Sequence, residues 1–307
     1  MSYKISKSQK VIPNIPLAKS TLEVAQHNLD ASSILYERAM YPEAIFFFQQ
    51  AMEKGCKAYG YYFGIITESD AISREIGHKG IGVYERSIRQ FQKIVKSIRE
   101  KLDLSKAIGQ DEENKEFFTL LGDDIDDAKK KLQNYREYSR NAAISKEELV
   151  KTLQRMQKVE QELDGVKQYV TKEEMSTIIS SSVKNAALNF IYSVIGTNSS
   201  VDSMKIEKMV QELEQSEISS IICAMLNHIS IMGSLLHLTL LSQPYESSTR
   251  YPSGTQSPLK IYNSQFPFVE QFIELSAWGK KTLNDMDHMF RTYPVGGEEY
   301  KSLEKSL

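Results

Sequence analysis

Apolar residues recur three and four positions apart through most of the chain, which is the spacing of an amphipathic helix. Runs of alternating β-branched residues, which would predict strands, do not stand out anywhere in the sequence. The pattern therefore predicts an all-α protein, a bundle of helices that bury their apolar faces against one another. The predicted apolar stripes occupy residues 22–35, 44–62, 84–98, 125–135, 149–166, 217–241 and 272–290.

The stripe at 44–62 is made mainly of small residues and predicts the central helix of the bundle. Small side chains allow two helix axes to approach closely. Pro42 suits the first turn of this helix, and Gly64 suits its end. The face holds Ala44, Phe48, Ala51, Gly55, Ala58 and Tyr62.

Prolines and polar residues mark the segments outside the helices. Pro13 and Pro16 predict an extended arm over residues 1–16, and a loop with three prolines is expected between 243 and 258. Ser216 is the predicted cap of the apolar helix at 217–241, which is nearly long enough to span a bilayer. The polar residues Asn227, His228, Ser230, Ser234 and His237 favour a buried core helix instead.

Composition narrows the classes of function. The chain of 307 residues is 41% hydrophobic and 25% charged, with a net charge of −2, so a nucleic-acid site must be a local patch. Cys56 and Cys223 form no CxxC pair, and we expect two buried free thiols and no zinc site. Residues 1–7 lack the apolar core of a signal peptide, and the expected location is cytoplasmic.

Residues 99–215 differ from the rest, because aromatic residues become rare and charged residues frequent. Ser145 and Glu148 have the spacing of a capping box before the stripe at 149–166. A further helix is expected to begin at Thr171 and to end near Gly196. The region predicts long helices in a protruding, coiled-coil-like antiparallel hairpin.

Common catalytic motifs are missing from the sequence. There is no phosphate-binding loop, no dinucleotide-binding turn, no HExxH and no GxSxG. The five histidines are scattered and form no metal-ligand arrangement with carboxylates. The sequence therefore predicts no cofactor and no metal site, and a metabolic enzyme is the least favoured class.

Three segments of the sequence resemble one family. Residues 41–58, with the order Tyr-Pro-Glu-Ala-Ile-Phe-Phe-Phe-Gln-Gln-Ala-Met-Glu-Lys-Gly-Cys-Lys-Ala, resemble the second helix of the HEPN domain. The name abbreviates higher eukaryotes and prokaryotes nucleotide-binding. Ile-Gly-His at 76–78 is similar to the opening of the third helix of that family, and Arg-Tyr-Pro at 250–252 to a turn before its last helix. The resemblance covers about 16–98 and 217–290.

The resemblance implies a HEPN-like helical bundle with an inserted hairpin. Residues 1–98 would hold the arm and the first part of the bundle, 99–215 the insertion, and 216–307 the C-terminal helices that complete the bundle. HEPN domains commonly dimerise, and many are RNases of toxin, antiviral defence or RNA-processing systems. The resemblance therefore implies a homodimer that associates with a nucleotide or RNA, with no membrane partner, in a prokaryotic defence or toxin-type system.

The family also implies site residues. Its RNases carry an arginine followed, after four to six residues, by a histidine, and here Arg74 and His78 are separated by only three. By this resemblance, His78 would act as acid or base in metal-independent cleavage, and Arg74 or Arg250 would stabilise the phosphate charge. Lys57, His78, Arg250 and Tyr251 are the nucleotide-binding candidates.

The same residues also have structural interpretations. His78 would brace the third helix, Lys57 would pair with Glu53 one turn away, and Arg250 would bond loop carbonyls. Trp278 is expected in the core or a dimer interface. The alternative function is a non-catalytic, oligomerising protein-interaction module that binds a partner protein through 99–215. Deleting 105–212 would then abolish partner binding and leave a folded bundle.

Overall fold

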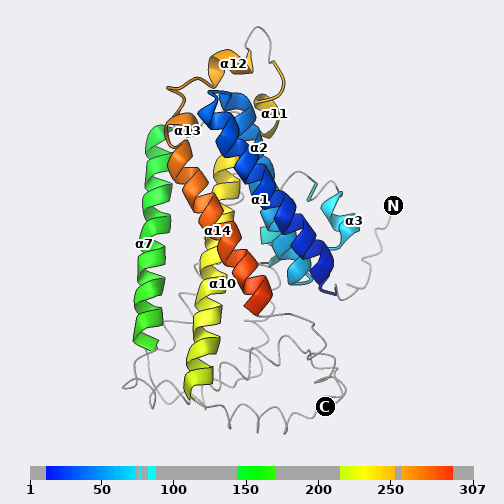
Figure 1. Ribbon diagram of the computed structural model, residues 1–307, viewed down its shortest axis with the longest axis vertical. Coiled ribbons are helices and arrows are strands. Elements are labelled where there is room, and N and C mark those ends of the chain that lie inside the picture. The colour runs from blue at the N-terminus through cyan, green and yellow to red at the C-terminus, as the bar shows by residue number, and fades with distance from the viewer. Residues whose placement is uncertain are drawn as a thin grey trace, which may run out of the picture.

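The computed structural model describes residues 12–73, 76–77, 80, 82–87, 144–170, 215–252 and 257–292. The regular elements in these residues are all α-helices, which confirms the all-α prediction. The insertion as a whole remains a prediction, because only its helix at 146–170 lies fully within the described part. Five long helices form the bundle (Figure 1): α1 (Ile15–Glu37), α2 (Tyr41–Tyr62), α7 (Lys146–Val170), α10 (Gln215–Ser242) and α14 (Phe272–Thr292).

Helices α1 and α2 form a hairpin with clearly marked ends. The side chain of Asn14 caps α1 by accepting a hydrogen bond of 3.2 Å from the backbone N–H of Leu17. Pro16 lies in the first turn of α1 and not in an extended arm, because proline fits a position whose N–H has no helical partner. As predicted, Pro42 opens α2, and Gly64, with a φ of 60°, follows its end.

Helix α2 occupies the middle of the bundle and contacts α1, α10 and α14. The whole predicted small-residue face is buried, which confirms the central position. A Cβ atom added at Gly55 would lie 2.9 Å from a methyl group of Leu283 and 3.1 Å from one of Leu235. The glycine therefore lets α14 and α10 both pack closely against α2.

Helix α7 packs against α10 and runs antiparallel to it (Figure 1). The predicted capping box is present, since the backbone N–H of Glu148 donates to the Ser145 hydroxyl and the Ser145 N–H donates to the Glu148 carboxylate. Val159 further along is 49% exposed. The N-terminal half of α7 therefore joins the core, through the buried residues Leu149, Leu153 and Met156.

Helix α10 contributes buried leucines to the core, as its polar interruptions predicted. Its described start is Gln215, so Ser216 lies inside the helix and the prediction of a cap at Ser216 is wrong. Among the described residues, no helix has both the length and the hydropathy that crossing a membrane requires. The buried leucines are Leu235, Leu238 and Leu241.

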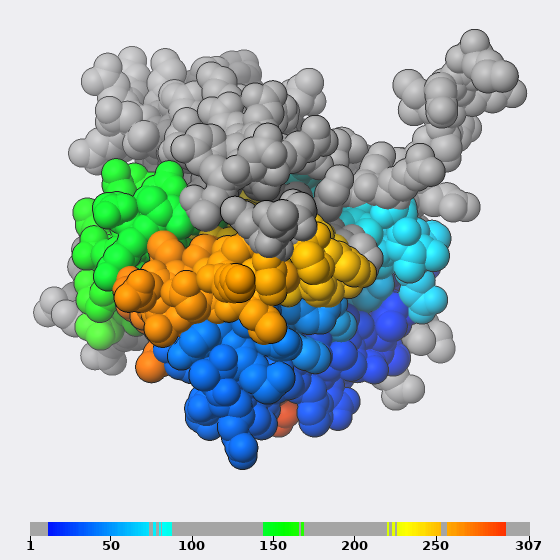
Figure 2. Space-filling model, turned by 90° about the horizontal axis from the view of Figure 1, so that it is seen from above, coloured from blue at the N-terminus to red at the C-terminus, as the bar shows by residue number. Residues whose placement is uncertain are grey.

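Three one-turn helices lie between α10 and α14, in the predicted proline-containing loop and in the residues that follow it. Two of them begin at a proline, because proline presets the backbone angle of a first helical turn. Figure 2 shows the residues between α10 and α14 lying across one end of the bundle. In this view α7 is to their left, and α1 and α2 are below them. The helices are α11 (Tyr245–Ser248), α12 (Pro258–Ile261) and α13 (Pro267–Glu270); a further short helix, α3 (Glu68–Ala71), follows α2.

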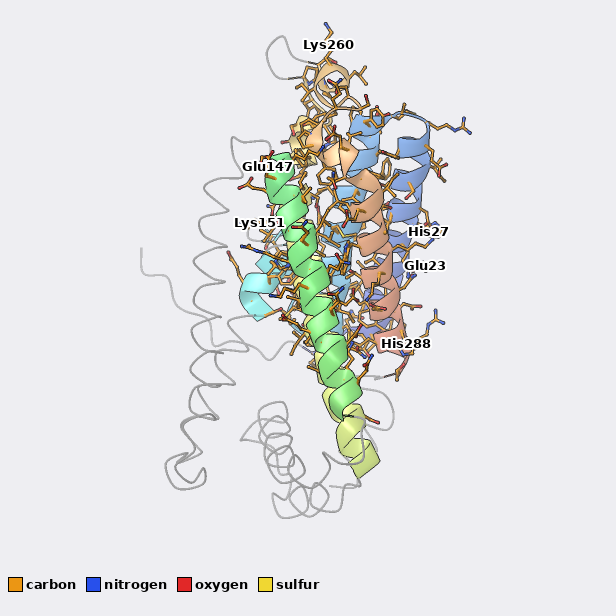
Figure 3. All side chains as sticks on the ribbon, turned by 90° about the vertical axis from the view of Figure 1, so that its left-hand side faces the viewer. Glu23, His27, Glu147, Lys151, Lys260 and His288 are labelled. Atoms are coloured by element: carbon orange, nitrogen blue, oxygen red, sulfur yellow. The ribbon has the colours of Figure 1, made fainter. Side chains whose placement is uncertain are left out.

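Aromatic contacts fix α14 against α1 and α2. The ring of Phe290 stacks on Tyr62 with centroids 3.8 Å apart, and Phe272 stacks on Tyr36 at 4.4 Å. The side chains fill the space between the helices, whereas His27 on α1 and His288 on α14 point outward (Figure 3). The apolar stripe predicted for the last helix is confirmed, since Phe272, Leu283, Met286 and Phe290 are all buried.

Candidate functional site

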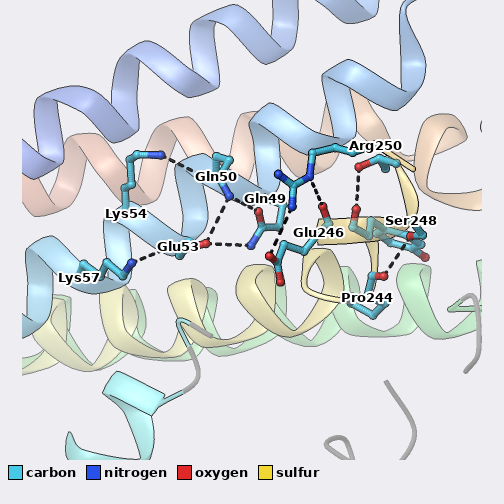
Figure 4. A network of polar contacts seen from close by, with 11 residues as sticks. Gln49, Gln50, Glu53, Lys54, Lys57, Pro244, Glu246, Ser248 and Arg250 are labelled. Atoms are coloured by element: carbon cyan, nitrogen blue, oxygen red, sulfur yellow. Dashed lines mark hydrogen bonds and ion pairs between the residues drawn. The ribbon is translucent and has the colours of Figure 1, made fainter. Parts of the chain in front are cut away.

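A row of polar side chains follows one edge of α2, where it faces α10 and α11 (Figure 4). Positions three and four apart lie on the same face of a helix, so the sequence itself aligns them. Gln49 and Glu53 are each only 3% exposed, whereas Gln50, Lys54 and Lys57 are partly exposed. We call these five residues the polar edge of α2: Gln49, Gln50, Glu53, Lys54 and Lys57.

Glu53 is the centre of the polar edge. One carboxylate oxygen lies 2.8 Å from the ammonium nitrogen of Lys57, and the other accepts hydrogen bonds of 3.3 Å from the amides of Gln49 and Gln50. The Glu53 side chain is 4% exposed and that of Lys57 is 16% exposed. The predicted pair is therefore a nearly buried ion pair, in which the lysine offsets a charge that water cannot solvate.

Lys54 adds a second cation to this edge. It donates a hydrogen bond of 3.0 Å to the side-chain oxygen of Gln50. Burial lowers the pKa of Lys54, and the nearby Glu53 carboxylate opposes that shift. Lys54 and Lys57 thus offer two ammonium groups within one turn, and the Gln50 bond fixes the direction of the first.

Gly80, which follows α3 in the sequence, packs against the next turn of α2. A Cβ atom at Gly80 would lie 3.3 Å from the Cys56 sulfur and 3.1 Å from Thr239 of α10. Cys56 and Thr239 share a hydrogen bond of 3.0 Å. Burial raises the pKa of the Cys56 thiol to about 12, so it is neutral near pH 7 and is not a nucleophile there. Cys56 is buried as predicted, but Cys223 is only partly buried.

A partly buried tyrosine–histidine pair lies one turn further along. The Tyr59 hydroxyl is 2.9 Å from Nε2 of His228, and Phe63 meets the imidazole edge to face at 4.6 Å. Burial lowers the pKa of His228 to about 4, so the imidazole is neutral near pH 7. The sequence marked His228 only as a polar interruption of an apolar helix. A polar residue in an apolar helix was the signal from which a polar partner for His228 could have been inferred.

Arg250 and Tyr251 lie at the other end of α2. The Arg250 guanidinium stands over the ring of Phe46 at 5.0 Å and over that of Tyr251 at 5.1 Å. Its Nε donates to the carbonyl oxygen of Glu246 at 3.1 Å, and the Glu246 carboxylate lies 3.8 Å from another guanidinium nitrogen. The carbonyl bond that the structural interpretation of Arg250 expects is therefore present.

The predicted site residues do not all meet at one point. Phe46, which contacts Arg250, precedes Lys57 by eleven residues, and a helix rises about 1.5 Å per residue, or roughly 16 Å in all. Arg74 and His78 lie outside the described residues, although Gly77 and Gly80 beside His78 are described. Groups of three or more metal-ligating side chains are not found within the described part of the chain.

Comparison with known proteins identifies one family. The family model of the HEPN domain matches residues 18–182, which is more than half of the chain. The match begins at Ala18 within α1 and includes α2, α3 and α7, and with them Lys57, Arg74 and His78, but it ends before α10 and Arg250. Searches among curated proteins and among solved structures returned no match.

Proposed function

The chain belongs to the HEPN family, and from that premise we propose that it binds RNA through phosphate contacts at the cationic end of the polar edge of α2. The observation that carries the proposal is the packing of Gly80 against Cys56, directly beside Lys57. Gly80, which follows His78 by two residues in the sequence, thereby lies against the turn of α2 that precedes Lys57. Cations beside a histidine form the usual environment for binding a phosphodiester.

Chain connectivity supports a single site at this turn. His78 is two residues from Gly80, and consecutive Cα atoms are about 3.8 Å apart, so the two Cα atoms are separated by no more than about 7.6 Å. Arg74 is equally close in sequence to Ile76, which is fully buried. We infer that Arg74 rather than Arg250 is the charge-stabilising partner of His78, because Arg250 lies at the opposite end of the polar edge.

Such a site has the groups for metal-independent phosphodiester cleavage. A histidine whose pKa is near neutral transfers the proton, while an arginine and lysines stabilise the negative charge that develops on the phosphate. We propose His78 as the acid or base and Arg74 as the stabilising cation. A dimer in a prokaryotic defence or toxin-type system is the setting that we propose for this activity.

The test is incubation of a mixed, labelled RNA pool with the full-length protein in the presence of a chelator. We expect wild-type protein to bind the pool and to cleave it, and His78→Ala to lose cleavage. His27→Ala is the matched control, because His27 is exposed on α1 and points away from the bundle (Figure 3). It should behave like wild type.

The outcomes separate binding from cleavage. Cleavage that the chelator stops, or that His78→Ala retains, would contradict the proposed chemistry. Binding without cleavage would leave an RNA-associated HEPN protein and remove the catalytic roles of His78 and Arg74. If folded wild-type protein neither binds nor cleaves RNA, the proposal fails, and the non-catalytic interaction module becomes the function to test.

A further inference from the structure

An exposed cationic and aromatic surface lies about three turns of α2 away from Lys57. It consists of Phe46, Arg250 and Tyr251, and we call it the arginine–tyrosine platform. The Arg250 side chain is 39% exposed and Tyr251 is 62% exposed. Among the large apolar side chains that are exposed in the described residues, Tyr251 is the one aromatic. An exposed ring beside an exposed guanidinium calls for an explanation that the bundle core does not supply.

The platform has the groups that bind an unpaired nucleotide. Aromatic rings and guanidinium planes stack on exposed bases, and the guanidinium also donates to phosphate oxygens. The contacts to Phe46, Tyr251 and the Glu246 carbonyl hold Arg250 in one direction. A guanidinium has five N–H donors, and the bond to Glu246 uses the Nε one. The ion pair with the Glu246 carboxylate, at 3.8 Å, involves only Nη2, so Nη1 is the nitrogen placed to meet a phosphate.

A partly exposed strip of α2 connects the platform to Lys57. Between Phe46 and Lys57, the positions of α2 with access to solvent are Phe47, Gln50 and Lys54, and the others are buried. Their spacing of three and four residues puts them on one face of the helix. The strip contains no acidic residue, because the intervening Glu53 is buried and paired with Lys57.

The distance between the platform and Lys57 determines which kind of ligand can contact both. We propose that the platform holds a second position on the same RNA strand, about 16 Å from the Lys57 site, so that the ligand is a single strand and not a mononucleotide. A stacked strand advances about 3.4 Å per nucleotide, so the span corresponds to roughly five nucleotides. This inference rests on the proposed function. It adds the length of the ligand and a second contact, at the platform, that only a ligand of this length reaches.

The test is fluorescence anisotropy of the full-length protein with labelled single-stranded RNA of about ten nucleotides, which exceeds the span, and of about two, which does not. Tyr251→Ala should weaken binding of the longer RNA about 5- to 150-fold, the usual effect of losing one stacked base, and leave binding of the shorter RNA unchanged. Tyr251→Phe keeps the ring and should bind like wild type. Leu259→Ala removes another exposed side chain near this end of the bundle, 70% exposed, and should also have no effect.

Each other outcome has a distinct meaning. If Tyr251→Ala binds the longer RNA as wild type does, the platform is not an RNA contact and the inference is wrong. If the variant weakens both lengths equally, the platform is not a remote second position, and the inference is equally wrong. If wild-type protein binds neither length, the proposed function itself fails.

Discussion

Glu53 and Lys57 show how one pair of residues serves both folding and binding. The carboxylate is almost inaccessible to water, and the lysine is the cation that offsets its charge. Removing one partner of such a pair leaves an uncompensated buried charge, which costs far more than the pair contributes. Lys57 is therefore required for the stability of the fold, whatever it contributes to binding. A loss of RNA binding by a Lys57 variant is informative only if the fold is preserved.

The pair gives a prediction about stability. Lys57→Met should lower the free energy of unfolding by about 2–3 kcal/mol, somewhat less than for a fully buried pair because the ammonium group keeps some contact with water. The double variant Glu53→Gln with Lys57→Met should recover most of the loss, since both charges are then absent. Urea unfolding of the single and double variants measures both effects. A double variant as unstable as Lys57→Met would show that packing, and not charge, controls this position.

His228 gives a prediction about pH. Its pKa in the folded protein is about 4, against an ordinary value of 6.5, so the unfolded chain binds a proton that the folded protein does not. Stability should therefore be complete above pH 6.5 and fall as the pH drops toward 4. The imidazole keeps partial solvent contact, and we expect a loss of about 1–2 kcal/mol.

The matched variant is His228→Gln, which keeps a hydrogen-bonding group beside Tyr59 and does not titrate. Its stability should fall less than that of wild type between pH 6.5 and 4, although His237, whose pKa burial also lowers, contributes in both proteins. Urea unfolding across this range gives the two curves. Parallel curves would mean that His228 does not titrate on unfolding.

Sequence and structure agree at the residue scale where partners are close along the chain. The Glu53–Lys57 pair follows from helical spacing alone. The burial of Glu53 does not follow from it, because that depends on α10 and α11. The Tyr59–His228 pair joins residues 169 positions apart, and its members carry no pattern that would pair them in one sequence.

At the scale of helices, the apolar period is sufficient to predict that a long helix is present and which of its faces is buried. This period predicts α2 and α14 with their core residues. The spacing of Ser145 and Glu148 predicts the capping box of α7. The apolar period does not predict α11, α12 and α13, because one turn of helix is too short to show a period and the prolines indicate a loop. Helix α11 holds Arg250, which stands over Phe46, and the geometry of the platform therefore could not be predicted.

The close packing of the helices can be tested by replacing each of two glycines with alanine. We expect the two substitutions to change the stability in opposite directions. Gly55→Ala should destabilise the protein by up to about 2 kcal/mol, because the new methyl group meets Leu283 at 2.9 Å and this overpacking outweighs the helix propensity of alanine. Gly165→Ala on α7 should stabilise by up to about 1 kcal/mol, since nothing lies within 4 Å and alanine favours a helix. Thermal or urea unfolding of both variants makes the comparison. Equal signs would contradict the close approach at Gly55.

At the scale of the whole molecule, the arrangement of helices separates residues that the sequence combined into one site. The sequence alone gives no distance between Lys57 and Arg250, and both are candidates for binding one nucleotide. Helix α2 is long, Lys57 lies in its C-terminal half, and α11 brings Arg250 to its N-terminal half. A ligand that contacts both must therefore extend along the helix, which changes the expected ligand from a nucleotide to a strand.

The last prediction concerns whether α7 is part of the same folding unit as the bundle. The interaction-module hypothesis expects that deleting 105–212 leaves a folded bundle, but α7 supplies Leu149, Leu153 and Met156 to the core and its Lys146 pairs with Glu270 of α13 at 2.9 Å. We therefore expect Leu153→Ala to lower the global free energy of unfolding by about 2–4 kcal/mol, because it opens a cavity in a shared core. Val159→Ala on the same helix should change it by less than about 0.5 kcal/mol.

Hydrogen exchange distinguishes the two cases. If α7 is part of one cooperative unit, Leu153→Ala will accelerate the exchange of the most protected amides in α2 and α10 as well as those of α7. If α7 folds separately, only its own amides will exchange faster, and deletion of 105–212 will then leave a stable bundle. The first outcome would make the helix at 146–170 a structural part of this HEPN protein, with any partner-binding surface confined to the rest of 99–215.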